Sequence, residues 1–397
     1  MPAAGHALSA NLHGGHGPLS LPHRTGDAFS AAHQIRVGSV CSGMGTCAHA
    51  LNLVKAANPE LHAHVAFFVE LNRHCQEVLA ADFPGVTVYD DLSDWCSELP
   101  GCDVLCAGFP CQPYSQANRR RKGSADPRAG VVDDLLAYIA RVKPLVVALE
   151  NVVGLLSFGR DVLRKICTQL QDCGYQVALQ KLSGHTHGGV PQKRRRLYIV
   201  GIIEPMRPVP WPRPIPAIRL SSILKTDYQP QSELPSARKA ALKVRIAEGA
   251  LEMVGSTTEA ELAEAVVNCH AQSGKLFLGG HTPCLTAARG AQGGFWLLAQ
   301  HRMMSTAELL HLQGVPASKS CLGGARPPVS KRQAGKMIGN AFTMTVFARV
   351  LAAALASAGL EVMDPFADLA APQEEEQRRK QRRTRLSSRD GKLRRPR

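Results

Sequence analysis

Between residues 35 and 203, short apolar runs alternate with amphipathic stretches, and this alternation limits the fold more than any other feature of the sequence. Apolar strands separated by helices are typical of βαβ units, which build a mostly parallel sheet. We therefore expect an α/β fold with a doubly wound, mostly parallel sheet. Helices are expected near residues 47–57, 73–81, 131–142 and 161–173, between the strands IRVGSV, HVAFFVE, VTVY, DVLCAGF, PLVVALE, YQVALQ and RRLYIVGII.

Changes in composition divide the rest of the chain. Residues 1–33 are rich in Ala, Gly, His and Ser, and we expect them to be disordered. The proline-rich stretch PMRPVPWPRPIP cannot belong to a regular element, so it marks a boundary after residue 203. The sequence then predicts a main domain over 34–203, a small second domain with little sheet over 204–300, helices that return to the main domain over 301–360, and a disordered basic tail over 361–397.

Several helix boundaries can be predicted outside the main domain. Thr306 can cap the helix that follows HRMMS, because a threonine hydroxyl accepts a hydrogen bond from the free amides of the first turn. A turn at Gly339 and Asn340 is expected to start the last helix, which ends by Gly359. The second domain is expected to contain one helical stretch over 236–251.

The chain carries 47 Lys and Arg against 32 Asp and Glu, a formal net charge of +15. Residues 373–397 hold eleven of the basic and four of the acidic residues, so the remainder is basic as well. This excess favours a polyanionic partner such as nucleic acid. The stretch 378–385 would be a nuclear import signal in a eukaryote, or a nonspecific tether to DNA, and organellar or bacterial cytoplasmic locations stay open.

The twelve cysteines include no Cys-x-x-Cys pair, so neither a zinc site nor a disulfide framework has the required spacing. We expect free thiols, a reducing compartment and no metal. No apolar run reaches the roughly 18–20 residues that a membrane span needs, so no membrane contact is expected. The oligomeric state is not fixed by the sequence, and we expect a monomer.

The first predicted strand turns into a helix through GMGTCA, residues 43–48, which fits a G-x-G-x-x-A pattern. Glycines in such a turn let the backbone approach a nucleotide at the carboxyl end of the sheet. Glu70 ends the second strand, where a carboxylate can hold ribose hydroxyls, and Asp91 after the third strand can accept from an adenine amino group. Alternatively, both are solvated charges. The turn does not distinguish a dinucleotide from an adenosyl-sulfonium cofactor.

Cys111 lies in GFPCQPYS, directly after the fourth predicted strand and between Pro110 and Pro113. The two prolines restrict the backbone and remove two amide donors, so the thiol is presented rigidly, as a nucleophile requires. An inert buried cysteine is the common alternative.

Other polar side chains reach the same edge of the sheet. Glu150 and Asn151 end the fifth strand, whereas Gln192, Arg194 and Arg196 alternate into the following strand and so share one face. A thiol, a carboxylic acid and arginines beside a nucleoside pocket suggest chemistry on a base.

The ordered stretches GFPCQPYS, ENVVGL, QKRRRLYIVG and IGNAF, with SVCSGMG as the cofactor turn, resemble the motifs of the cytosine-5 DNA methyltransferase family. The resemblance covers about residues 35–203 and 282–358. It implies the class I S-adenosylmethionine-dependent methyltransferase fold, S-adenosylmethionine as cofactor, DNA as partner, and target recognition by residues 204–300. The cofactor-binding residues that it implies are Cys41, Ser42, Gly43, Gly45, Glu70, Asp91, Pro110 and Asn340.

The resemblance also implies a covalent mechanism on a cytosine turned out of the duplex. The Cys111 thiolate would add to carbon 6, and carbon 5 would then take the methyl group. Glu150 would hydrogen-bond or protonate ring nitrogen 3, Arg194 would hold the carbonyl oxygen of the base, and Asn151 the Pro110 loop. The catalytic set so implied is Cys111, Glu150, Asn151, Gln192, Arg194 and Arg196, with both arginines expected to help the thiol ionise.

Two parts of the chain, one loop and the second domain, are expected to contact nucleic acid. The stretch QANRRRKGSADPRAG would close behind the flipped base, with a solvated basic loop as the alternative. The second domain would supply phosphate contacts from Arg213, Arg219, Lys225, Arg238, Lys239, Lys243 and Arg245.

The cofactor turn departs from the family pattern, which usually has Asp, Phe and Gly at the positions of Ser39, Cys41 and Thr46. A cysteine cannot cover an adenine edge as an aromatic ring does. The alternatives are a tRNA cytosine-5 methyltransferase of the same family and a non-catalytic nucleic-acid-binding relative. A nicotinamide oxidoreductase would explain the glycine turn but not the cysteine loop.

Overall fold

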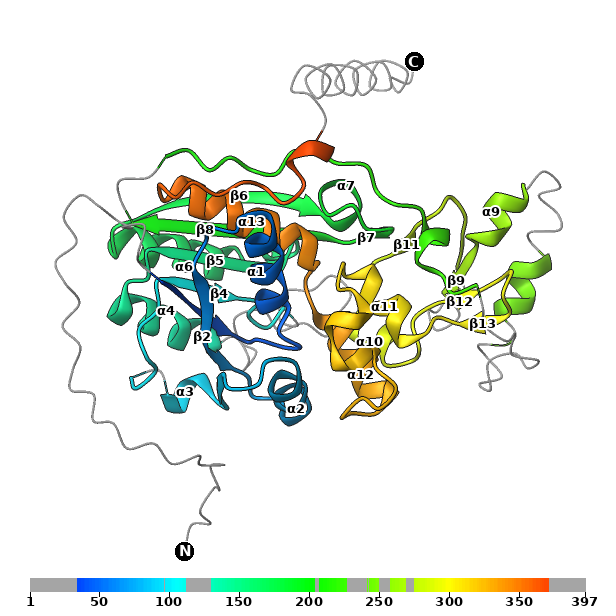
Figure 1. Ribbon diagram of the computed structural model, residues 1–397, viewed down its shortest axis with the longest axis horizontal. Coiled ribbons are helices and arrows are strands. Elements are labelled where there is room, and N and C mark those ends of the chain that lie inside the picture. The colour runs from blue at the N-terminus through cyan, green and yellow to red at the C-terminus, as the bar shows by residue number, and fades with distance from the viewer. Residues whose placement is uncertain are drawn as a thin grey trace, which may run out of the picture.

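The computed structural model describes residues 34–95, 97–111, 130–203, 207–226, 241, 243–249, 258–268 and 275–370. A main α/β domain and a smaller domain lie side by side in Figure 1. The expectations for residues 1–33, for the basic tail beyond residue 370, for most of the loop after Cys111, and for Arg238 and Lys239 fall outside the described residues.

A seven-stranded sheet forms the centre of the main domain, in the order β3-β2-β1-β4-β5-β8-β6. The pairs from β3 to β5 are parallel, and β8 is antiparallel to both of its neighbours. The prediction of a mostly parallel sheet is therefore confirmed. The strands are β1 Ile35–Val40, β2 Ala63–Val69, β3 Thr87–Tyr89, β4 Val104–Ala107, β5 Val146–Val152, β6 Tyr175–Ser183 and β8 Arg195–Ile203.

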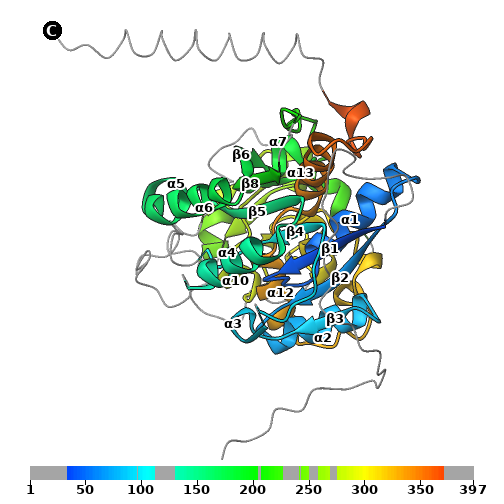
Figure 2. The same ribbon diagram turned by 90° about the vertical axis from the view of Figure 1, so that its left-hand side faces the viewer.

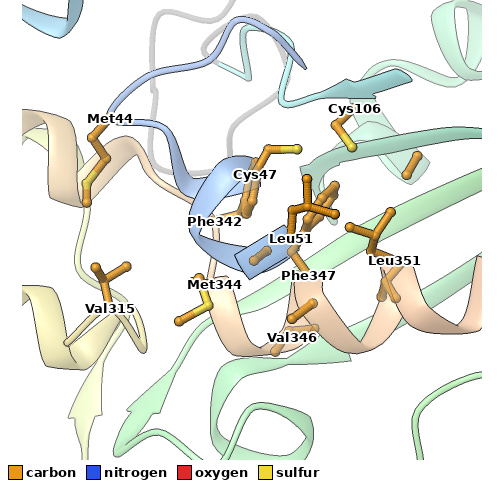
Figure 3. Close-up of a cluster of buried hydrophobic side chains, with 14 of the residues drawn as sticks. Met44, Cys47, Leu51, Cys106, Val315, Phe342, Met344, Val346, Phe347 and Leu351 are labelled. Atoms are coloured by element: carbon orange, nitrogen blue, oxygen red, sulfur yellow. The ribbon is translucent and has the colours of Figure 1, made fainter. Parts of the chain in front are cut away.

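Helices cover both faces of this sheet, as Figure 2 shows. α1 (Thr46–Ala57) and α13 (Met344–Ser357) lie on one face, whereas α4 (Val131–Val142) and α6 (Arg160–Asp172) lie on the other. Two hydrophobic clusters result, one on each side. In the first, apolar side chains of α1 and α13 face each other next to Cys106 of β4 (Figure 3). Shorter helices are α2 Arg73–Asp82, α3 Leu92–Trp95, α5 Leu155–Phe158 and α7 Gly184–His187.

The last two helices begin and end differently from the prediction. Asn340 ends α12 (Lys331–Asn340), and α13 starts only at Met344, because the chain is extended at Ala341 with ψ 147°. Ser305, not Thr306, caps α11 (Thr306–Leu312). The Ser305 hydroxyl accepts from the Glu308 amide while the Glu308 carboxylate accepts from the Ser305 amide, so the S-x-x-E capping box sets the start.

The smaller domain contains little sheet, as expected, and its described strands are short. Its four antiparallel strands are β10 Lys275–Phe277, β9 Val266–Asn268, β12 Trp296–Leu297 and β13 Arg302–Met303, preceded by α9 Glu259–Ala263. Each strand has two or three residues, too few for a clear alternation of polar and apolar side chains. Trp296 and Val267 are buried in its own small core.

The proline-rich segment runs along the main domain before it enters the smaller one. The amides of Arg207, Ile215 and Ile218 donate to the carbonyls of Ser357, Thr186 and Gly189. Further along the chain, β11 (Thr282–Pro283) pairs with β7 (Gln192–Lys193). The described chain thus rejoins the main domain by residue 282, and the domain boundaries near 204 and 300 stay a prediction.

A close backbone contact continues this return. α10 (Ala287–Gly290) packs on α12, where a Cβ added at Gly290 would lie 1.9 Å from the Gly335 carbonyl oxygen. Only glycine fits at such a crossing. This packing brings the chain after β11 next to the end of α12, which borders the candidate site.

Ordered structure extends past residue 361, where the disordered tail was expected to begin. The fully buried Arg349 of α13 binds Asp364, with Nη2 and Oδ2 2.7 Å apart. The Met363 amide donates to Asn58 Oδ1 at 2.7 Å, and a 3₁₀ turn forms over Ala367–Leu369. Because a buried guanidinium needs a counter-charge, Asp364 fixes the segment to the fold.

The α12 and α13 region, Lys331–Ser357, is long and apolar enough by composition to cross a membrane, with a mean hydropathy of 1.5. However, 89% of that window is buried inside the protein, so packing in the core accounts for its composition. Within the described residues, ten cysteines are free thiols and no group of three His, Cys, Asp or Glu side chains could hold a metal ion.

Candidate active site

The turn after β1 has an unusual backbone that leaves room for a ligand. Cys41, Gly43 and Gly45 all have positive φ angles, of 53°, 58° and 78°. Cys41 is strained in this conformation because it carries a Cβ, and such strain gathers at functional sites. A Cβ added at Gly43 would meet no atom within 4 Å. The glycine therefore faces open space, as expected for a close approach of backbone to cofactor.

Glu70 joins this turn to the start of α2. Its carboxylate accepts from the Gly43 amide at 2.7 Å and from the Asn72 amide at 2.9 Å. Burial raises the pKa of Glu70, and the two amide bonds act in the opposite direction. Ser42 anchors the turn to β1 and β2, because its hydroxyl donates to the Ser39 and Val69 carbonyls.

Asp91 lies on the same side of the sheet. One of its oxygens accepts from the Ser93 amide at 3.0 Å and so caps α3. Burial, followed by the charges of Glu70 and Asp91, raises the pKa of the Cys41 thiol to about 12. Cys41 therefore stays a neutral thiol between two carboxylates, and these three side chains come together as the sequence predicted.

The loop that contains Cys111 is held from two sides. Asn151 is fully buried and donates from Nδ2 to the Phe109 carbonyl at 3.1 Å, in the residue before Pro110. A Cβ added at Gly108 would lie 3.3 Å from the Phe342 ring and 3.8 Å from Glu150 Oε2. The fold thus brings IGNAF, ENVVGL and the Cys111 loop together.

Glu150 faces Arg196 rather than Arg194. Its Oε1 lies 2.8 Å from Arg196 Nε, in a buried ion pair. Burial raises the pKa of Glu150, and the charges of Arg196 and Arg194 lower it by a smaller amount. A carboxylic acid with a raised pKa suits proton donation near neutral pH.

Arg194 and Gln192 both hydrogen-bond within the protein, and the role of Arg194 in holding a base stays a prediction. Arg194 donates from Nη1 to the Leu285 carbonyl at 2.7 Å and from Nη2 to the Asn340 carbonyl at 3.3 Å. Gln192 is fully buried, donates to the Leu312 carbonyl and accepts from the Leu285 amide. Both side chains are buried on one face of the strand, as their spacing of two residues predicts. Both hydrogen-bond to the segment near Leu285, where the chain returns to the main domain. Asn340 itself is exposed at the end of α12.

The charges around Cys111 act in opposite directions. Burial and the Glu150 charge raise the pKa of its thiol, whereas Arg196 and Arg194 act to lower it, as expected. Burial and Glu150 outweigh the two arginines. We infer that ionisation is coupled to substrate binding, when a base engages Glu150.

The sequence did not single out Cys284 as a site residue. The arginine charges that were expected to lower the pKa of Cys111 also act on the Cys284 thiol. Its pKa is lowered because Arg194 and Arg196 outweigh burial. The sequence held a signal for it, since Cys284 follows Pro283 as Cys111 follows Pro110.

Among the phosphate contacts expected from the second domain, Arg219 has another partner. Its guanidinium donates to both carboxylate oxygens of Glu264, at 3.0 and 2.7 Å, and Ser221 binds the same carboxylate. A bidentate pair of this kind positions the guanidinium within the protein. Arg219 is therefore a poor candidate for a phosphate contact.

Because Arg194 and Arg196 have different partners, we expect a substitution at Arg196 to affect kcat and a substitution at Arg194 to affect stability. Arg196→Lys is expected to lower kcat more than tenfold with a melting temperature near that of the wild type, because the lysine cannot span Glu150 and its other acceptors. Arg194→Lys is expected to reduce the free energy of unfolding by about 2–3 kcal/mol, because buried carbonyls lose their donor. Kinetics and thermal denaturation of both variants measure this. Equal effects of the two variants on stability would contradict the assignment.

Solved structures with the same fold are methyltransferases. The chain is similar to Entamoeba histolytica methyltransferase EhMeth (TM-score 0.59, 15% identity, 82% of this chain and 98% of that one) and to S. pombe Dnmt2 methyltransferase (TM-score 0.56, 17% identity, 81% and 98%). A putative DNA modification methyltransferase from an E. coli prophage gives a TM-score of 0.56 at 18% identity, over 81% of this chain and 99% of that one. The fold is the class I S-adenosylmethionine-dependent methyltransferase fold.

The model of the C-5 cytosine-specific DNA methylase family matches residues 35–356. The chain belongs to this family, and the resemblance found in its motifs is confirmed.

Curated relatives match over part of the chain. The type II methyltransferase M.NlaX of Neisseria lactamica is 34% identical over 151 residues, 38% of this chain and 48% of its own length. M.HaeII of Haemophilus aegyptius is 34% identical over 164 residues, 41% and 50%. The chain thus spans about half the length of these relatives. Both come from bacteria, so the comparisons do not support the nuclear location that the basic tail suggested.

Proposed function

We propose that this protein is a DNA (cytosine-5)-methyltransferase that uses S-adenosylmethionine and a covalent Cys111 adduct. The observation that carries the proposal is the cysteine loop, which Asn151 holds beside the buried pair of Glu150 and Arg196. A nucleophile, a carboxylic acid with a raised pKa and a fixed guanidinium are the groups that addition to a pyrimidine requires.

The proposed chemistry starts with the Cys111 thiol. Its thiolate adds to carbon 6 of an extruded cytosine, and the electron pair of the carbon 5–carbon 6 double bond moves toward carbon 5 and the ring. Glu150 gives or shares a proton with ring nitrogen 3, which neutralises the developing charge. Arg196 keeps Glu150 in place through their ion pair.

Methyl transfer and elimination complete the cycle. Carbon 5 takes the methyl group, its proton leaves to a base, and the electrons of the broken carbon–hydrogen bond re-form the double bond and expel Cys111 as thiolate. Ring nitrogen 3 returns its proton to Glu150 as carbon 5 is methylated, and the expelled thiolate takes back from solvent the proton that Cys111 lost before the addition, so the enzyme returns to its starting state.

The residues around the turn after β1 fit the cofactor. Gly43 faces open space, the amide of Gly43 and the carboxylate of Glu70 form one edge, and Asp91 forms another. Glu70 would hold the ribose, Asp91 the adenine amino group, and Ser42, Gly45, Pro110 and Asn340 the rest of the cradle. When bound, S-adenosylmethionine supplies an electrophilic methyl group on its sulfonium. Cys41 covers the adenine less than an aromatic ring would, so we expect weak cofactor binding.

DNA is proposed over RNA because the family model is one of DNA methylases and the matched bacterial relatives are type II methyltransferases. The net charge of +15 suits either polymer. A tRNA substrate remains the second candidate.

One assay separates the two polymers. Purified protein is incubated with tritiated S-adenosylmethionine and either duplex DNA or total RNA, and the labelled nucleoside is identified after digestion. We expect 5-methylcytosine in DNA. Label confined to RNA would replace DNA with the tRNA alternative, and wild-type protein that labels neither polymer would favour a non-catalytic binding role.

A further inference from the structure

The Cys284 sulfur lies within the fork of Arg196 and against Arg194. It is 4.0 and 3.9 Å from Arg196 Nη1 and Nη2, and 3.4 Å from Arg194 Nη1. Arg289 Nη1 donates to the Cys284 carbonyl. Three guanidinium groups therefore surround one residue, which arrives from the smaller domain about 90 positions along the chain.

Arg196 contacts two side chains, Glu150 and Cys284, and its Nη1 also donates to the Arg195 carbonyl at 2.8 Å. Its Nε lies 2.8 Å from Glu150 Oε1, and both of its Nη atoms face the Cys284 sulfur. Because a guanidinium is planar, acceptors on two edges fix its orientation. In the described residues, Glu150 Oε1 has no hydrogen-bond partner besides this ion-pair contact, so the position of the carboxylate depends on where Arg196 is held.

The positive charges at this cluster lower the pKa of Cys284. The groups that face it are Arg194, Arg196 and Arg289, with Glu150 beyond Arg196. The pKa of Cys284 is lowered and that of Cys111 is raised, so Cys284 is the more acidic of the two thiols beside the arginine pair. When protonated, Cys284 can instead donate to the Leu285 carbonyl, 3.7 Å away.

We propose that Cys284 is a positioning residue of the active site. Its sulfur orients Arg196 against Glu150 and, when ionised, offsets the positive charge of the arginines at Cys111. The role rests on the proposed function, because it serves the group that activates the base. Cys284 need not touch the substrate. Negative charge on the Cys284 sulfur would reduce the positive potential that the arginines produce at Cys111, and so help to keep the pKa of Cys111 raised.

The test combines kinetics with thiol reactivity in Cys284→Ala, Cys284→Ser and a matched control, Cys167→Ser, whose half-buried thiol lies on α6. Steady-state methyl transfer gives kcat and KM. Alkylation by iodoacetamide between pH 6 and 10, read for the Cys111 peptide by mass spectrometry, gives the pH midpoint of Cys111 in the absence of substrate. Thermal denaturation checks that each variant is folded.

We expect the two readouts to move in opposite directions. In both Cys284 variants the alkylation midpoint of Cys111 falls by about one pH unit, because the arginine charge is no longer offset. The kcat of Cys284→Ala falls at least tenfold with KM within about twofold, and Cys284→Ser keeps more activity because its hydroxyl leaves a polar group beside the guanidinium groups. Cys167→Ser matches the wild type in both.

An unchanged Cys111 midpoint in the variants, or a wild-type kcat in Cys284→Ala, would overturn the proposal. Failure of the proposed function shows differently, as wild-type protein that methylates no DNA. The alkylation midpoints would still report the charge arrangement in that case.

Discussion

Cys111→Ser is expected to abolish methyl transfer to DNA, with a loss of at least about 10⁴-fold in kcat. A serine hydroxyl is a far weaker nucleophile than a thiol at neutral pH, and no other described thiol lies on the loop beside Glu150. The measurement is tritium transfer from labelled S-adenosylmethionine into duplex DNA at saturating concentrations of both.

The control for this variant is Cys167→Ser, which replaces a thiol on α6, away from the loop. It should retain full activity. Cys111→Ser should also bind DNA with near wild-type affinity, because the phosphate contacts are unchanged. Residual turnover above about one per cent in Cys111→Ser would mean that the thiol is not the nucleophile.

Glu150→Gln is expected to reduce kcat by about 10²- to 10⁴-fold, the usual contribution of a positioned general acid. Glutamine preserves the size of the side chain and can hydrogen-bond to ring nitrogen 3, but it cannot transfer a proton. Glu361→Gln, at an exposed position, is the matched control and should behave as the wild type.

The pH dependence provides a second readout for Glu150. Methyl transfer needs Glu150 in its protonated form and Cys111 as a thiolate. Burial raises the pKa of both groups, so this combination is populated only over an intermediate range of pH, and kcat should fall on both sides of that range. We expect a bell-shaped profile in the wild type and no descending limb in Glu150→Gln. A descending limb that survives this substitution would assign the proton to another group.

The local part of the fold could be predicted from the sequence because its signal is periodic and short in range. The strand IRVGSV matches β1, and residues 131–142 match α4, since both are bounded by clear turns. The start of α11 was missed by one residue because Thr306 competed with Ser305, whose capping box includes Glu308. The strands of the smaller domain could not be located in the sequence because they are too short to show a period.

The sequence could predict which side chains reach the site, but not which of two similar side chains, Arg194 or Arg196, contacts Glu150. Period two placed Arg194 and Arg196 on one face, but it could not show that the returning chain at Leu285 covers Arg194 and leaves Arg196 for Glu150. The same tertiary contact brings Cys284 to the arginines. Residues about 90 positions apart meet there, and no pattern within either segment encodes that meeting.

The most direct test of the covalent mechanism is a trap. Duplex DNA in which the target cytosine carries fluorine at carbon 5 is incubated with the protein and S-adenosylmethionine, and the mixture is denatured and analysed by gel and by peptide mass spectrometry. Because fluorine cannot leave as a proton does, the adduct should persist, with the DNA attached to the Cys111 peptide and absent in Cys111→Ser. Turnover on ordinary DNA without any adduct on the fluorinated DNA, or attachment to another residue, would contradict the account.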